Sequence, residues 1–173
     1  TAMFQEGLRL PGVRVMREDR LIDDIVAIIR ENVRLPELAL GDLNAQLAAA
    51  RIADMSARCA QTTLVLGGFS QGAAAVSMLA GVPPVGQRIG SIGSAPPLPA
   101  ASADRVAAVA VFGNPGALFG TPLSTTGAFA GRAIDLCSSG DPICSGGRDR
   151  AAHSVYEFSP YPERAAGFVA GLV

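Results

Sequence analysis

The sequence predicts an α/β fold, a three-layer sandwich in which helices cover both faces of a mostly parallel sheet. Three observations support this prediction. Segments with helical spacing of apolar residues alternate along the chain with short runs rich in valine, alanine and leucine. The run over 105–112 lacks polar alternation, as expected for a strand buried on both faces of a parallel sheet. A chain of 173 residues, 49% of them hydrophobic, can bury a full core.

The expected elements follow from apolar spacing and from the glycines and prolines that interrupt it. Residues 1–20 predict no clear element. The helices are expected over 21–33, 43–58, 71–80 and 162–172, the strands over 62–66, 105–112 and 132–136, and loops over 82–104, 117–130 and 137–158. In the helix over 43–58, Leu47, Ile52 and Met55 are expected on the face that packs against the sheet. No internal repeat is visible, so we predict a single domain over 1–173.

The composition excludes two classes of partner. Fourteen basic and 15 acidic residues leave a net charge of −1, and aromatic residues are only 5% of the chain, so we expect no nucleic-acid partner. No apolar stretch reaches the ~18 residues of a membrane span, so we expect no segment that crosses a membrane. The first residues show no charged-then-apolar leader, so we expect any secretory signal to have been removed already.

Three cysteines are distributed unevenly. Cys137 and Cys144 enclose a turn-rich segment, whereas Cys59 stands alone. The close pair indicates a disulfide if the protein is exported, or two buried thiols if it is cytosolic. Three cysteines and one distant histidine do not form a zinc spacing, so we predict no metal site.

A nucleophile motif follows the strand over 62–66. Residues 68–72 read GFSQG, which fits the G-x-S-x-G elbow that presents a serine between a strand and a helix. We expect a Cβ on either Gly68 or Gly72 to clash in so tight a turn. The following helix would point its N-terminal N–H groups at the place where negative charge develops on a bound acyl group. The alternative is a glycine-rich turn in which Ser70 only caps the helix.

An activated serine needs a base and an acid that orients this base. His153 is the only histidine of the chain, so it must be the base of Ser70 unless it is an ordinary surface or capping residue. Asp141 is the best candidate for the acid, because it lies in a turn after a predicted strand, and sites of parallel sheets lie at these strand ends. The weaker acidic candidates are Asp104, Asp135 and Asp149.

These motifs together resemble the cutinase family of serine esterases. The residues that carry the resemblance are GGFSQGA over 67–73, CSSGDPIC over 137–144, the later His153, the early Cys59 and VFGNP over 111–115. The resemblance covers residues 43–173. It implies an α/β-hydrolase fold and a secreted or cell-surface enzyme without a cofactor. Its open, lidless site would accept small-molecule or lipid esters with short to medium acyl chains.

The resemblance also implies a role for each site residue. Ser70 would be the nucleophile, His153 the general base and then acid, and Asp141 the residue that orients the histidine. The backbone N–H of Gln71 would be one oxyanion donor. Cys137 and Cys144 would form a disulfide.

Residues 1–42 depart from the family. They contain neither the Arg-Gly-Ser or Arg-Gly-Thr turn that carries a second oxyanion donor nor a cysteine that could pair with Cys59. The sequence therefore leaves three hypotheses. The first is a serine esterase. The second is a catalytically weak or inactive relative, acting as a binding or surface protein or needing a partner chain that supplies a missing N-terminal strand. The third is a thioesterase or acyltransferase with the same triad.

Overall fold

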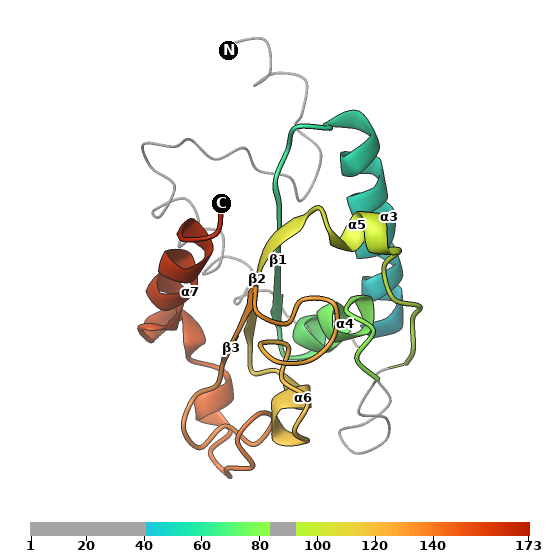
Figure 1. Ribbon diagram of the computed structural model, residues 1–173. Coiled ribbons are helices and arrows are strands. Elements are labelled where there is room, and N and C mark those ends of the chain that lie inside the picture. Colours follow the sequence, from blue (N-terminus) through green and yellow to red (C-terminus); the bar gives the residue numbers. More distant parts are fainter. Residues whose placement is uncertain (1–40, 84–92) are drawn as a thin grey trace.

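The computed structural model describes residues 41–83 and 93–173 (Figure 1). The helix expected over 21–33 lies outside the described residues, and so does the rest of 1–40, nearly all of the segment that departs from the family. The single domain over 1–173 therefore stays a prediction.

The described part of the chain contains a three-stranded parallel sheet in the order β1-β2-β3. The strands are β1 (Leu64–Phe69), β2 (Val106–Phe112) and β3 (Ala133–Leu136). The central strand β2 is buried along almost its whole length, in keeping with its valine- and alanine-rich sequence. Strand β1 ends three residues later than expected, because Gly67, Gly68 and Phe69 still pair with β2. Backbone pairing needs no side chain, so the two glycines continue the strand.

Helices cover both faces of this sheet (Figure 1). On one side lie α3 (Gly41–Arg58), α4 (Gln71–Leu79) and the short α5 (Ala100–Ala103), and on the other lies α7 (Tyr161–Ala170). Successive residues of β2 contribute to different cores, with Val109 and Val111 on the α3–α4 side and Ala110 and Phe112 on the α7 side. The predicted three-layer α/β architecture is confirmed.

The face that α3 buries differs in part from the expected one. Ile52 is buried as expected, but Leu47 is 61% exposed, and Ala45 is buried in its place with Ala48 and Ala49 packed beside it. These four positions have i, i+3, i+4, i+7 spacing, which defines one helix face. Because alanines are small, this face can approach the alanine-rich helix α4 closely, and that packing outweighs the burial of a single leucine.

Short helices occupy parts of the expected loops. They are α5, α6 (Pro115–Leu118) and the 3₁₀ turns η2 (Ala151–His153) and η3 (Tyr156–Phe158). In α6 the Asn114 side chain accepts a hydrogen bond from the Gly116 N–H at 3.0 Å, and Pro115 occupies the first helical position. A capping asparagine followed by proline starts a helix, although the same residues also predict a turn.

Candidate active site

Ser70 lies at the junction of β1 and α4, where it follows Phe69 and precedes Gln71. Its backbone has φ 52° and ψ −109°, the only positive φ of a non-glycine residue in the described part of the chain. Its N–H donates to the carbonyl of Phe112 at 2.8 Å, which ties the turn to β2. A strained serine held by the neighbouring strand is the geometry of a nucleophile elbow.

The two glycines of the motif have different environments. A Cβ on Gly68 would lie 2.6 Å from backbone atoms of Gly72, so only glycine fits there. A Cβ on Gly72 would meet nothing within 4 Å. The expectation of a clash at Gly72 is therefore wrong. The turn is crowded only on the strand side. The backbone of the first turn of α4 lies against the Cβ position of Gly68, whereas the Cβ position of Gly72 is open.

His153 lies between the serine and the acid. Its Nε2 is 2.8 Å from Oγ of Ser70, and its Nδ1 is 2.7 Å from Oδ2 of Asp141. An ionised carboxylate only accepts hydrogen bonds, so Nδ1 carries the proton and Nε2 is free to accept the Ser70 hydroxyl proton. The imidazole stacks on the ring of Phe69 with centroids 4.8 Å apart, which holds its plane.

Asp141 is completely buried. Its Oδ1 accepts the Ile143 N–H at 2.7 Å, while Oδ2 accepts Nδ1 of His153 and, at 2.6 Å, the hydroxyl of Tyr156. Burial by itself would raise the pKa of this carboxyl, but the hydrogen bonds from Tyr156, His153 and Ile143 outweigh it, and the net effect is a pKa below the usual value. Asp141 is therefore ionised at neutral pH and can orient an imidazole.

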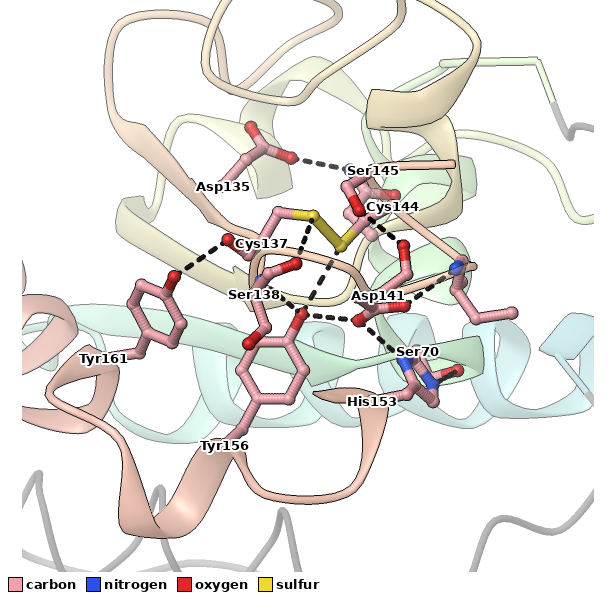
Figure 2. The surroundings of a disulfide bond; sticks show 12 residues. Ser70, Asp135, Cys137, Ser138, Asp141, Cys144, Ser145, His153, Tyr156 and Tyr161 are labelled. Atoms are coloured by element: carbon pink, nitrogen blue, oxygen red, sulfur yellow. Dashed lines mark hydrogen bonds and ion pairs between the residues drawn. A yellow bond between two sulfur atoms is a disulfide. The ribbon is translucent and has the colours of Figure 1, made fainter. Parts of the chain in front are cut away.

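A disulfide closes the loop that carries Asp141 (Figure 2). It joins Cys137 to Cys144, as the resemblance implied. Directly after the loop, the Ser145 hydroxyl donates to the Asp141 carbonyl at 2.6 Å. The backbone at the carboxylate is thus held both covalently and by hydrogen bonds.

Gly113 follows β2 and lies against the pair formed by His153 and Asp141. It has φ 58°, and a Cβ there would lie 2.9 Å from Cε1 of His153 and 3.4 Å from Oδ2 of Asp141. In the sequence, Gly113 stands out only as part of the VFGNP stretch that carries the family resemblance. A glycine directly after a central strand, at the edge where the site lies, is the signal that could have identified it.

Tyr156 is a residue that sequence reasoning missed. It is fully buried in η3, and its hydroxyl donates to the carboxylate of Asp141. Burial and this hydrogen bond raise the pKa of the Tyr156 phenol, so the hydroxyl keeps its proton. The sequence offers a weak signal at most, because a single tyrosine in a polar stretch does not reveal that it points inward.

The other predicted residues lie as follows. Gln71 is the first residue of α4, directly after Ser70. Asp135 bonds to Asn114 and to the backbone of Ser124, both at 2.7 Å, and so belongs to a separate network. The Asp149 carboxylate accepts the Ala151 N–H and lies two residues before η2. Asp104 ends α5, and Cys59 is unpaired.

The described residues contain neither a candidate metal site nor a candidate membrane span. Over 41–83 and 93–173, no group of three or more histidine, cysteine or acidic side chains is placed to hold a metal ion. No helix within these ranges has the length and apolar character needed to cross a membrane.

The strand, elbow serine, imidazole and buried carboxylate, in the chain order Ser…Asp…His, define the α/β-hydrolase class. Within this class, the family profile of cutinases matches residues 41–173. The chain belongs to the cutinase family, which confirms the resemblance found in its motifs.

Several curated relatives and solved structures are similar to this chain. It is 46% identical over 125 residues to the probable carboxylesterase Culp3 of Mycobacterium tuberculosis, covering 70% of this chain and 46% of Culp3. It is 42% identical over 123 residues to the phospholipase Culp4 of the same organism, covering 70% of this chain and 52% of Culp4. The chain thus spans about half the length of these curated relatives.

A solved cutinase structure is also similar to this chain. The Trichoderma reesei cutinase in complex with a C11Y4 phosphonate inhibitor has a TM-score of 0.52 and 29% identity, covering 74% of this chain and 49% of that one.

The N-terminal segment is similar to a different family. Residues 1–59 match the profile of hydantoinase B/oxoprolinase, and this match overlaps the cutinase match over 41–59. The part of the chain that lacks cutinase motifs is therefore the part that has another similarity.

Proposed function

We propose that this protein is a serine esterase that hydrolyses carboxylic esters through Ser70, His153 and Asp141. The observation that carries the proposal is the unbroken chain of contacts from Oγ of Ser70 through His153 to Asp141, at 2.8 and 2.7 Å. Similarity to proteins named carboxylesterase and phospholipase supports an ester substrate.

In the proposed reaction, Oγ of Ser70 attacks the ester carbonyl carbon while its proton passes to Nε2 of His153. The alcohol leaves with this proton, and the acyl group stays on Ser70. A water molecule activated by the same imidazole then releases the acid. We propose that the backbone N–H of Gln71, at the N-terminus of α4, stabilises the oxyanion in both steps.

The substrate class and the location are also proposals. We propose small-molecule or lipid esters of short to medium acyl length, as the cutinase resemblance implies, and the name of one relative, a phospholipase, supports a lipid ester. We propose a secreted or cell-surface protein, because a disulfide such as Cys137–Cys144 persists in oxidising compartments.

The test is hydrolysis of p-nitrophenyl butyrate by the full chain. Ser70→Ala should lower kcat by about 10⁶-fold, the loss seen when a triad serine is removed. Ser77→Ala is the matched control, because Ser77 lies on the same helix and its hydroxyl donates to the Ala73 carbonyl within that helix. An alkyl phosphonate should label the wild type at Ser70. Hydrolysis that survives Ser70→Ala would disprove the proposal, and product analysis with water and alcohol acceptors separates hydrolysis from acyl transfer.

A catalytically weak relative that needs a partner chain is the second candidate. The observation in its favour is that β1 pairs only with β2 among the described residues, and Val65 on this strand is 36% exposed. A strand edge without a neighbour is a place where another chain can pair. Two measurements on the pure protein separate the candidates: the rate at which the phosphonate labels Ser70, and the turnover of the ester. A chain that needs a partner should be labelled slowly and should show little turnover at every protein concentration.

A further inference from the structure

The phenol of Tyr156 is buried between the imidazole of His153 and the loop over 137–144 that carries Asp141, here called the acid loop (Figure 2). Its hydroxyl donates to Oδ2 of Asp141 at 2.6 Å and accepts the Ser138 N–H at 2.9 Å. It also lies 3.4 Å from Sγ of Cys144. One hydroxyl thus contacts the carboxylate, the loop backbone and the disulfide.

Oδ2 of Asp141 receives two donors, Nδ1 of His153 and the Tyr156 hydroxyl. Without the phenol, Asp141 would be held only by the Ile143 N–H on Oδ1 and by the imidazole on Oδ2, so Oδ2 could turn away whenever the imidazole shifts. The phenol is itself fixed by neighbouring rings, so its hydrogen bond opposes this rotation of the carboxylate. Its ring packs against Phe69 and Phe112 with centroids 5.5 and 6.0 Å away.

We propose that Tyr156 is a positioning residue, which acts through Asp141 by holding Oδ2 toward Nδ1 of His153. This inference rests on the proposed esterase function. Burial raises the pKa of Asp141, and the hydrogen bond from Tyr156 is the largest of the interactions that lower it. The same contact therefore favours the ionised carboxylate.

Tyr161 supplies a matched control. The chain has only two tyrosines, and their rings pack together with centroids 5.7 Å apart. The Tyr161 hydroxyl donates to the Cys137 carbonyl at 2.9 Å, next to the Ser138 N–H that the other phenol accepts. Both hydroxyls therefore anchor the start of the acid loop, but only that of Tyr156 reaches the carboxylate.

The experiment compares Tyr156→Phe with Tyr161→Phe in the full chain. Both variants keep the ring and lose one hydroxyl. We expect Tyr156→Phe to lower kcat for p-nitrophenyl butyrate at least about tenfold with KM changed less than twofold, because misplacing a catalytic group costs rate rather than binding. Tyr161→Phe should stay within about threefold of the wild type.

A double-mutant cycle tests whether Tyr156 acts through Asp141. In the Asp141→Ala background, Tyr156→Phe should change kcat less than about twofold, because there is no carboxylate left to position. An equal loss in both backgrounds would overturn the proposal, and so would Tyr156→Phe activity close to the wild type or an equal loss in Tyr161→Phe.

An NMR measurement separates this inference from the proposed function. The chain has one histidine, so the Nδ1–H signal of His153 needs no assignment. We expect its exchange with solvent to be at least about tenfold faster in Tyr156→Phe than in the wild type or Tyr161→Phe. If the wild type hydrolyses no ester, the proposed function fails, and this signal alone decides the inference. Unchanged exchange would overturn it.

A second variant covers the case in which Tyr156→Phe does not fold. The ¹³Cζ signals of the two tyrosines are then compared between the wild type and Asp141→Ala, with assignments from Tyr161→Phe. The Tyr156 signal should shift when its carboxylate acceptor is removed, and the Tyr161 signal should not. Equal shifts, or none, would overturn the proposal.

Discussion

At the scale of single residues, the absence of a side chain on Gly113 lets the imidazole of His153 lie against the end of β2. We predict that Gly113→Ala lowers kcat/KM by at least about 100-fold, because its Cβ would lie 2.9 Å from Cε1 and displace the ring from Ser70. Ester hydrolysis and far-UV circular dichroism measure the effect.

Gly120→Ala is the control for this substitution. Gly120 also has a positive φ, 77°, but a Cβ there would meet nothing within 4 Å. Both variants should lose some stability from the strained backbone, and only Gly113→Ala should lose activity. Equal activities of the two variants would contradict the prediction.

Asp141 links stability to pH at the same scale. Its pKa in the folded protein lies below the ordinary value of 3.8, so the unfolded chain binds a proton more readily than the native one. The contribution of this group to stability is therefore complete above about pH 4 and is lost as the pH falls through the folded-state pKa.

We predict that Asp141→Asn lowers the free energy of unfolding at pH 6, and that its deficit relative to the wild type shrinks at lower pH. Urea unfolding between pH 6 and pH 2.5 measures both quantities, provided that both proteins refold reversibly. A deficit that stays constant over the whole range would contradict the assignment of a lowered pKa to this carboxyl.

At the scale of elements, the elbow between β1 and α4 depends on one glycine rather than two. We predict that Gly68→Ala destabilises the protein by about 3 kcal/mol or more, because its Cβ would lie 2.6 Å from the backbone of α4 and force strand and helix apart. Chemical unfolding measures the loss.

Gly72→Ala is the matched substitution on the helix side of the elbow. Its Cβ has open space, and alanine favours a helix over glycine by about 1 kcal/mol. We therefore expect this variant to be as stable as the wild type or slightly more stable. Comparable destabilisation of both variants would show that the turn is crowded on both sides.

At the scale of the whole molecule, the Cys137–Cys144 disulfide connects the stability of the fold to the site. We predict that the double variant Cys137→Ala/Cys144→Ala loses about 2.5 kcal/mol, the loop-closure entropy of so short a loop. It should also lose esterase activity, because Asp141 lies in this loop. Urea unfolding and ester hydrolysis measure the two effects.

Cys59→Ser controls for the loss of a sulfur atom. Cys59 forms no disulfide, so its replacement should leave esterase activity unchanged. If the double variant kept full activity, the hydrogen bonds within the acid loop would suffice to place Asp141 without the covalent link.

The agreement between sequence and structure depends on the range of the interactions involved. The elbow at Ser70 and the buried strand β2 were predictable, because glycine spacing and uninterrupted valine and alanine are local patterns. The buried face of α3 was not, because it depends on how closely alanines let two helices approach. Likewise, the short helices α5 and α6 lie within stretches whose prolines and glycines also suit loops.

The sequence by itself determined the α/β architecture, the cutinase family and the candidate residues Ser70, Asp141 and His153. Only the tertiary structure brought Ser70 and His153, 83 residues apart, to within 2.8 Å and placed the buried phenol of Tyr156 against Asp141. The physical reason is that a residue's type and spacing restrict the chemistry available to it, whereas burial and contact between distant side chains arise from packing of the whole sheet and its helices.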